Sequence, residues 1–117
     1  MEFLLILNDP AYGTERSYNG LRLAMALKKE NPEDTVRVFL IGDAVTCAVA
    51  GQKTPDGYYN LERMSRALVG KKVDIKCCGT CLDARGIEES SLVNGVKRGT
   101  MSDLAKWTST SNSVITF

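Results

Sequence analysis

Glu2-Phe3-Leu4-Leu5-Ile6-Leu7 is an almost continuous apolar run at the start of the chain, and Asn8-Asp9-Pro10 ends it. Such a run is typical of a strand that is buried on both faces, as in a parallel sheet with helices on each side. Residues 36–41 repeat the pattern with β-branched side chains. Between these two runs, apolar residues recur at helical spacing over 21–27, so the sequence predicts a strand, a helix and a second strand.

The remainder of the chain continues this alternation. The elements predicted after the second strand are a short helix over 44–50, a helix over 61–69, a strand over 73–77, a helical turn over 81–86, a short strand or turn over 93–96, a helix from Thr100 and a strand over 113–117. Asn60 is the predicted N-cap of the second long helix, and Thr100 with Asp103 forms a predicted capping box. Strands that alternate with helices in this way predict an α/β fold with a mostly parallel sheet.

The composition is that of an ordinary globular domain. A chain of 117 residues suffices for one hydrophobic core, so residues 1–117 are predicted to form a single domain. The net charge is +1 with no run of like charges, so neither nucleic acid nor a membrane surface is expected as a partner. No apolar run approaches the ~20 residues of a membrane span, and the first residues lack a signal-peptide cleavage site, so we expect a cytoplasmic protein.

The chemically distinctive stretch is Lys76-Cys77-Cys78-Gly79-Thr80-Cys81-Leu82-Asp83-Ala84-Arg85-Gly86, which holds three of the four cysteines. The chain has no histidine, which excludes a cysteine–histidine dyad for peptide or ester hydrolysis. A thiol is nucleophilic as its thiolate, and the Cys-x-x-Cys spacing suits reversible disulfide chemistry. Backbone N–H groups of a tight turn, the start of a helix, or the cation Arg85 would lower the pKa of such a thiol. Cys78, Cys81 and Arg85 are therefore the predicted catalytic residues.

The predicted sheet also indicates which other residues lie near the cysteines. In an open α/β sheet, ligands bind beyond the carboxyl ends of the strands, where the loops converge. Residues 8–13, 42–47 and 78–85 follow three predicted strands and should share one rim. The predicted substrate-binding residues there are Asn8, Tyr12, Gly13, Gly51 and Gln52.

Several of these features also have simpler interpretations. Cys47 and Cys77 are expected in the core, because a free cysteine behaves as a small hydrophobe and adjacent strand residues point to opposite faces. The Cys-x-x-Cys pair can be a chance pair in a loop, and Arg85 can be a surface residue paired with Asp83. A structural zinc site usually has four ligands, and only Cys47 is left to join the cluster, so we expect no metal and no cofactor.

The order of several short motifs resembles one family. The motifs are Tyr12-Gly13-x-Glu15, Asn19-x-Leu21-Arg22-Leu23-Ala24, Asp43-Ala44-Val45, Gly51-Gln52-Lys53, Cys78-x-Thr80-Cys81-x-Asp83-x-Arg85-Gly86-Ile87 and Ala105-x-Trp107-Thr108, with Thr116-Phe117 at the end. Together they resemble the DsrE/DsrF-like proteins, most closely their YchN-like branch, over nearly the whole chain. The resemblance implies a three-layer α/β/α domain around a five-stranded parallel sheet, assembled as a homo-oligomer, either a trimer or a hexamer of two trimers.

The same resemblance implies kinship with sulfur-relay subunits, which pass a persulfide sulfur from one protein cysteine to another. Their active cysteine follows a strand at the carboxyl edge of the sheet, which is the position of Cys78 or Cys81 here. The first hypothesis is therefore sulfur relay or thiol redox chemistry, with a sulfur donor protein and an acceptor protein as partners. The alternative is a non-catalytic oligomeric binding or regulatory module, whose cysteines are incidental or sense oxidation.

Overall fold

The computed structural model describes all residues from 1 to 117. Five strands form one sheet in the order β4-β3-β2-β1-β5, and every neighbouring pair is parallel. The strands are β1 (Glu2–Leu7), β2 (Thr35–Leu40), β3 (Asp74–Cys78), β4 (Lys97–Gly99) and β5 (Ser113–Thr116). The predicted α/β fold with a five-stranded, mostly parallel sheet is confirmed.

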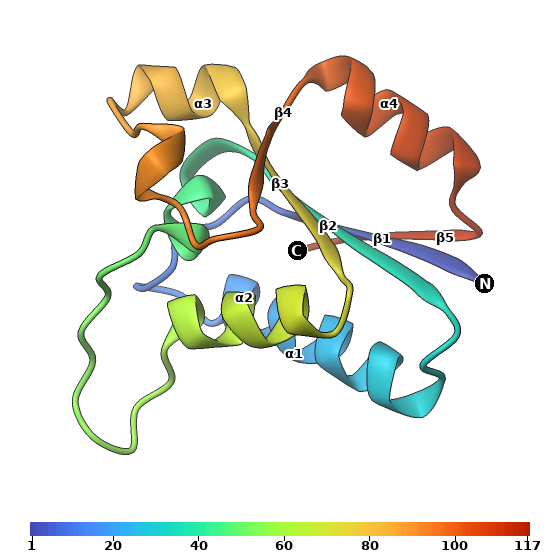
Figure 1. Cartoon of the computed structure of the whole chain (residues 1–117), viewed down its shortest axis with the longest axis horizontal. Helices are drawn as coiled ribbons and strands as arrows, with labels where there is room; N and C mark the ends of the chain where they lie inside the picture. The colour runs from blue at the N-terminus through green and yellow to red at the C-terminus, as the bar shows by residue number, and fades with distance from the viewer.

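Helices cover both faces of this sheet. They are α1 (Arg16–Glu30), α2 (Leu61–Gly70), α3 (Gly79–Ala84) and α4 (Met101–Thr110), with two 3₁₀ helices, η1 (Gly42–Ala48) and η2 (Glu89–Ser91). In Figure 1, α1 and α2 lie on one face of the sheet and α3 and α4 on the other, which confirms the three layers. None of the helices is both long enough and apolar enough to span a bilayer.

The two apolar runs of the sequence form inner strands of the sheet. Leu4, Leu5 and Leu7 of β1 have no exposed surface, and the same holds for Val38 and Phe39 of β2. Because helices cover both faces, successive side chains of a strand can all be buried, and a continuous apolar run results.

The predicted helix starts at Asn60 and Thr100 are confirmed. The Asn60 side chain accepts a hydrogen bond from the Arg63 N–H at 3.0 Å. The Thr100 hydroxyl accepts from the Asp103 N–H at 3.1 Å, and the Asp103 carboxylate accepts from the Thr100 N–H at 2.9 Å. Each bond satisfies a backbone donor that a helix leaves unpaired at its first turn.

Two parts of the chain differ from the prediction. The short helix is the 3₁₀ helix η1, and it ends at Ala48 because Val49 forms a β-bridge with Leu92. The fourth strand lies at Lys97–Gly99, where no strand was predicted, and of the two alternatives predicted for 93–96, a short strand or a turn, the turn is confirmed. Residues 93–96 form a turn closed by a 3.0 Å hydrogen bond from the Val96 N–H to the Val93 carbonyl, and both valines are buried in the core.

Candidate functional site

The carboxyl ends of β1, β2 and β3 meet on one rim, as the sequence predicted. The Ile41 N–H donates to the Leu7 carbonyl at 3.0 Å, so the chain leaves β2 beside the end of β1. The Gly42 N–H then donates to the Cys81 sulfur at 3.2 Å, which joins the segment after β2 to the segment after β3. The cysteine motif therefore lies on this rim.

Cys78 is both the last residue of β3 and the N-cap of α3. Its side chain is only 6% exposed, and the Thr80 hydroxyl lies 3.3 Å from its sulfur. Gly79 begins α3, and a Cβ at this position would lie 2.6 Å from Nε of Arg98. Glycine at position 79 therefore lets the guanidinium of Arg98 lie directly against the backbone next to Cys78.

Cys78 and Cys81 differ in their affinity for a proton. Burial raises the pKa of Cys78, but hydrogen bonds from the Cys81 thiol, the Thr80 hydroxyl and the backbone N–H groups of both residues outweigh burial, and the pKa is lowered. Burial and the neighbouring Cys78 sulfur raise the pKa of Cys81, against the opposing effect of the Gly42 N–H. Cys78 is therefore the more readily ionised thiol of the pair, and Cys81 is the hydrogen-bond donor to it.

Cys47 and Cys77 lie in the core, as predicted. Neither has any exposed surface. Burial raises the pKa of each to about 12, because a thiolate without water is strongly disfavoured. Cys77 and Cys78 are adjacent on β3, so their side chains point to opposite faces of the sheet. The pKa of Cys77 is raised, whereas the pKa of Cys78 is lowered.

Arg85 is not paired with Asp83, the partner that the sequence offered. Its Nη2 and Nε donate to one Asp43 oxygen at 2.7 and 3.1 Å, and its Nη1 donates to the Cys81 carbonyl at 3.0 Å. Arg85 thus ties the end of α3 to η1 on the rim. Its charge lowers the pKa of Cys81, as the Gly42 N–H does more strongly. Burial and the neighbouring Cys78 outweigh both and raise the pKa.

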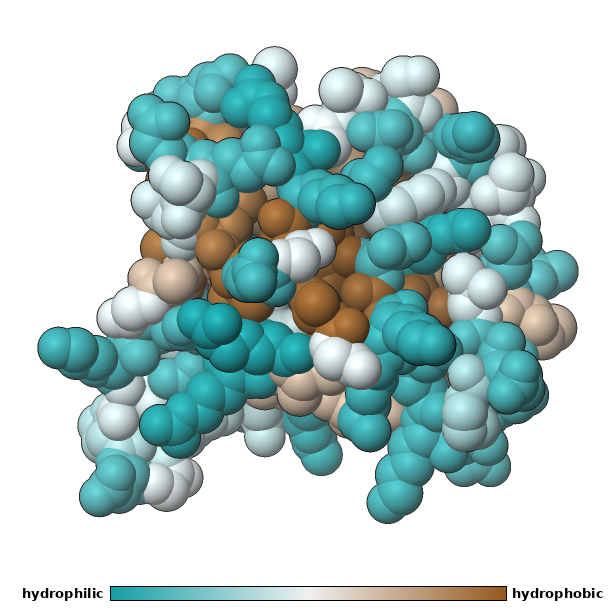
Figure 2. Space-filling model, in the orientation of Figure 1, coloured by the Kyte–Doolittle hydropathy of each residue, from teal (hydrophilic) through white to brown (hydrophobic).

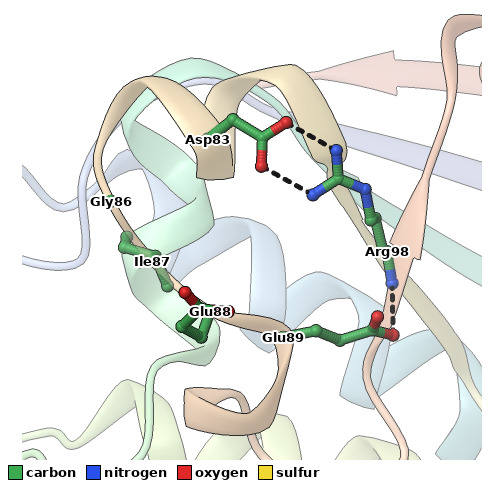
Figure 3. A pocket seen from close by; sticks show the side chains of 6 residues that line it. All are labelled: Asp83, Gly86, Ile87, Glu88, Glu89 and Arg98. Carbon is green, nitrogen blue, oxygen red and sulfur yellow. Dashed lines mark hydrogen bonds and ion pairs between the residues drawn. The ribbon is translucent and has the colours of Figure 1, made fainter.

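Asp83 pairs instead with Arg98, a residue that was not among the predicted site residues. Figure 3 shows the guanidinium of Arg98 reaching from β4 to the Asp83 carboxylate on α3, with Nη1 and Nη2 at 2.9 and 2.7 Å from its two oxygens. The Arg98 backbone N–H donates to Glu89 at 3.2 Å, which fixes the strand to η2. Arg98 is far from Cys78 along the chain. It could have been predicted as a site residue only if β4 had been recognised, because Arg98-Gly99-Thr100 lies at the carboxyl end of that parallel strand.

A small pocket of about 170 Å³ opens beside Cys78. It is lined by Cys78, Gly79, Thr80, Arg98, Gly99, Thr100 and Met101. β4 supplies one wall because Cys78 and Gly99 are register partners in the β3–β4 pair. A cysteine with a lowered pKa and a permanent cation therefore line one small space, an arrangement that suits nucleophilic attack by the thiolate on a small reactant.

Tyr12 and Gln52, both predicted as binding residues, lie together but in a different pocket. The Tyr12 hydroxyl donates to the Gln52 side-chain oxygen at 2.6 Å, and the Gln52 amide nitrogen donates to carbonyls of η1 and Val49. They line a largely apolar groove of about 490 Å³ that also contains Ile87. This groove and the Cys78 pocket share no lining residue.

The other predicted binding residues have contacts within the fold. The Asn8 side chain donates to the carbonyl of Phe117 at 3.0 Å, and the Gly51 N–H donates to Glu62 at 2.9 Å. Gly13 lines a third hollow, together with Thr14, Glu15, Tyr58 and Tyr59. The structure thus places Arg98 beside Cys78, while a role for the other rim residues in binding stays a prediction.

Known proteins resemble this chain over almost all of its length. The sequence model of the DsrE/DsrF-like family matches residues 1–117. Protein YchN of Escherichia coli is 40% identical over 116 residues, which cover 99% of this chain and 98% of YchN. An uncharacterized protein of Methanocaldococcus jannaschii is 36% identical over 117 residues, which cover all of both chains.

Solved structures show the same fold. The crystal structure of the E. coli YchN protein superposes with a TM-score of 0.95 at 40% identity, over 99% of this chain and 98% of the other. A protein of unknown function from Methanobacterium thermoautotrophicum superposes with a TM-score of 0.79 at 14% identity, over 99% of this chain and 97% of the other. The second likeness supports the fold alone.

Proposed function

Since the chain belongs to the DsrE/DsrF-like family, we propose that it carries sulfur as a persulfide on Cys78 and passes it to an acceptor thiol. The family is linked to sulfur relay. The single observation that carries the proposal is the state of Cys78, which is the one cysteine of the four whose pKa is lowered and which lines a pocket.

The proposed reaction begins with attack of the Cys78 thiolate on the outer sulfur of a donor persulfide, R–S–SH. A bond forms between Cys78 and that sulfur, the S–S bond of the donor breaks, and the donor leaves as a thiolate. The product is Cys78–S–SH. An acceptor thiolate then attacks the outer sulfur, takes it as a new persulfide and restores the Cys78 thiolate, so no net oxidation occurs and no cofactor is needed.

Cys81 has two roles in this proposal. Its thiol donates a hydrogen bond that favours the thiolate of Cys78 over the thiol. When no acceptor is present, the Cys81 thiolate can attack the inner sulfur of Cys78–S–SH, which forms a Cys78–Cys81 disulfide and releases HS⁻. An external dithiol then has to reduce that disulfide. Arg85 holds the Cys81 carbonyl and so positions α3, rather than touching the reacting sulfur.

Persulfide trapping tests this proposal. The protein is incubated with glutathione persulfide, alkylated and digested, and mass spectrometry locates the added sulfur atom. We expect one added sulfur on Cys78, loss of that product in Cys78→Ser, and a longer-lived product in Cys81→Ser, because the resolving thiol is absent. Added sulfur on Cys81 alone, or on no cysteine at all, would contradict the proposal.

A second candidate function is suggested by the groove at Tyr12, Gln52 and Ile87. Its lining is mostly apolar and it has no residue in common with the Cys78 pocket, so it can hold a ligand without any use of the cysteines. In that case the double variant Cys78→Ser/Cys81→Ser keeps its ligand binding and its thermal stability. Loss of sulfur transfer together with retained binding would separate the two functions.

The proposal also includes an oligomeric state, a location in the cell and two partner proteins. We propose a homo-oligomer of three or six chains in the cytoplasm, with one protein that donates sulfur and another that accepts it. The donor and acceptor are defined by their chemistry, a protein persulfide and a protein thiol.

A further inference from the structure

Arg98 is placed at Cys78 by the backbone of two strands. β3 and β4 pair in parallel with Cys77 opposite Arg98 and Cys78 opposite Gly99. The guanidinium extends along the start of α3, where a Cβ on Gly79 would lie 2.6 Å from its Nε and 2.8 Å from its Cζ. The cation therefore forms one wall of the pocket into which Cys78 faces.

The guanidinium of Arg98 is held in place but is not saturated. The Asp83 carboxylate takes one N–H from each terminal nitrogen, and the Glu89 carboxylate takes the backbone N–H (Figure 3). A guanidinium has five N–H donors, so Nε–H and two further donors remain after the Asp83 pair is formed. Fixed, unused donors next to a nucleophile suit the recognition of an anion.

The pocket is small. Its volume of about 170 Å³ is less than half that of the groove at Tyr12 and Gln52, which is about 490 Å³. Thr80, Gly99, Thr100 and Met101 complete the lining.

Arg85 provides the comparison within the same chain. It is also an arginine on the rim, and it also pairs with an exposed aspartate, Asp43. Its third contact is the Cys81 carbonyl, and it does not line the Cys78 pocket. Loss of a positive charge from the rim therefore occurs in variants of either arginine. A change in the reactivity of Cys78 toward reagents that enter the pocket is expected for variants of Arg98 alone.

We infer that Arg98, and not Arg85, is the specificity-determining residue of the Cys78 pocket, and that it favours reactants with a negative charge beside the reacting sulfur over neutral ones. The inference rests on the proposed function for its biological meaning, since the sulfur donor or acceptor would then carry a negative charge near its reactive sulfur. The attraction acts on the approach of the anion to the thiolate, because the guanidinium offsets the repulsion between two negative charges.

Two alkylating reagents of similar size test the inference without any sulfur transfer. Iodoacetate is an anion and iodoacetamide is neutral, and both react with the same thiolate. The rate constant of each reagent at Cys78 is measured by site-resolved mass spectrometry at low salt, and the ratio of the two is compared among variants. A change in the pKa of Cys78 affects both reagents equally and cancels in this ratio.

We expect Arg98→Gln to lower the iodoacetate-to-iodoacetamide ratio by roughly fivefold, a size typical of a partly exposed charge pair. Arg98→Lys should keep most of the ratio, and Arg85→Gln should leave it unchanged. Added salt should reduce the ratio in the natural protein but not in Arg98→Gln. Gly79→Ala, which displaces the guanidinium but keeps its charge, should lower the ratio as well.

An unchanged ratio in a folded Arg98→Gln variant, or an equal fall in Arg85→Gln, would overturn the inference. Circular dichroism and the melting temperature show whether each variant is folded. If Arg98→Gln does not fold, the ratio measured in Gly79→Ala tests the inference in its place. The persulfide experiment has a separate readout. If Cys78 takes up no sulfur while the ratio still depends on Arg98, the sulfur-relay proposal fails and anion selection by the pocket stands.

Discussion

The thiol of Cys81 lowers the pKa of Cys78, so the reactivity of Cys78 is expected to depend on it. We expect Cys81→Ala to remove a hydrogen-bond donor to the Cys78 sulfur and so to raise the pKa of Cys78. A thiol reacts in the pH range above its pKa, so the alkylation profile of Cys78 should move to higher pH. At neutral pH the rate should fall by roughly tenfold, the effect of one hydrogen bond to a charged group.

The measurement is the rate of iodoacetamide reaction at Cys78 as a function of pH. Cys81→Ser is the matched control, because its hydroxyl can still donate, and its profile should lie between those of the natural protein and Cys81→Ala. If the profiles of Cys81→Ala and the natural protein coincide, the thiol of Cys81 does not stabilise the thiolate of Cys78.

The sequence predicts part of this site and not the rest. Cys78 and Cys81 stand out because their spacing is local and the chain has no histidine to compete for a catalytic role. Which of the two ionises depends on hydrogen bonds formed only in the folded chain. Arg98 reaches the site through the register of β3 and β4, and no spacing along the sequence encodes a pairing between strands.

Helix α1 lies against the sheet through Gly20, and this contact can be tested. A Cβ on Gly20 would overlap Cδ2 of Leu7 and lie 3.2 Å from the ring of Phe117. Leu7 is fully buried and has little room to move. We expect Gly20→Ala to lower the free energy of unfolding by about 1–3 kcal/mol through overpacking, which exceeds the roughly 0.5–1 kcal/mol that alanine adds to a helix.

Gly70 offers a matched control for this substitution. It is also a helical glycine, in α2, but a Cβ there would have no atom within 4 Å. Gly70→Ala should therefore leave the free energy of unfolding unchanged or raise it slightly. Urea titration measures both variants, and equal stabilities for the two would show that α1 can move away from the sheet at no cost.

The elements that the sequence predicts well are those with a local cause. β1 and β2 are apolar runs, and Asn60 and Thr100 cap their helices through residues three positions further along the chain. β4 was not predicted at Lys97–Gly99, because its exposed residues, Lys97 and Arg98, lack the apolar character of a strand. Its position is fixed by pairing with β3 at the edge of the sheet, which the sequence does not display.

The surface of the whole molecule has features on which an expectation of self-association can be based. The sheet has two open edges, β4 and β5, and the large apolar side chains of Tyr58, Met101 and Val114 are exposed. Figure 2 also shows apolar atoms in the middle of the visible face, between the layer of α3 and α4 and the layer of α1 and α2. Open edges and exposed apolar groups are features that proteins cover with a partner.

We therefore expect three or six chains per particle in solution, as the family resemblance implies. Sedimentation equilibrium at micromolar concentration measures the mass, with the single-chain mass of 12.8 kDa as the unit. Val114→Lys places a charge on the exposed edge strand β5 and tests whether that edge takes part. A particle of one chain at all concentrations would contradict the expectation.

The two fully buried cysteines, Cys47 and Cys77, can report where the molecule opens locally. Cys47 lies in η1 and Cys77 lies in β3, and neither sulfur can react with a reagent in solution until local unfolding exposes it. A pulse of alkylating reagent thus marks each sulfur only during such an event. Label that appears on Cys47 before Cys77 would reveal that η1 detaches while the sheet stays closed, and simultaneous label would reveal a single cooperative unit.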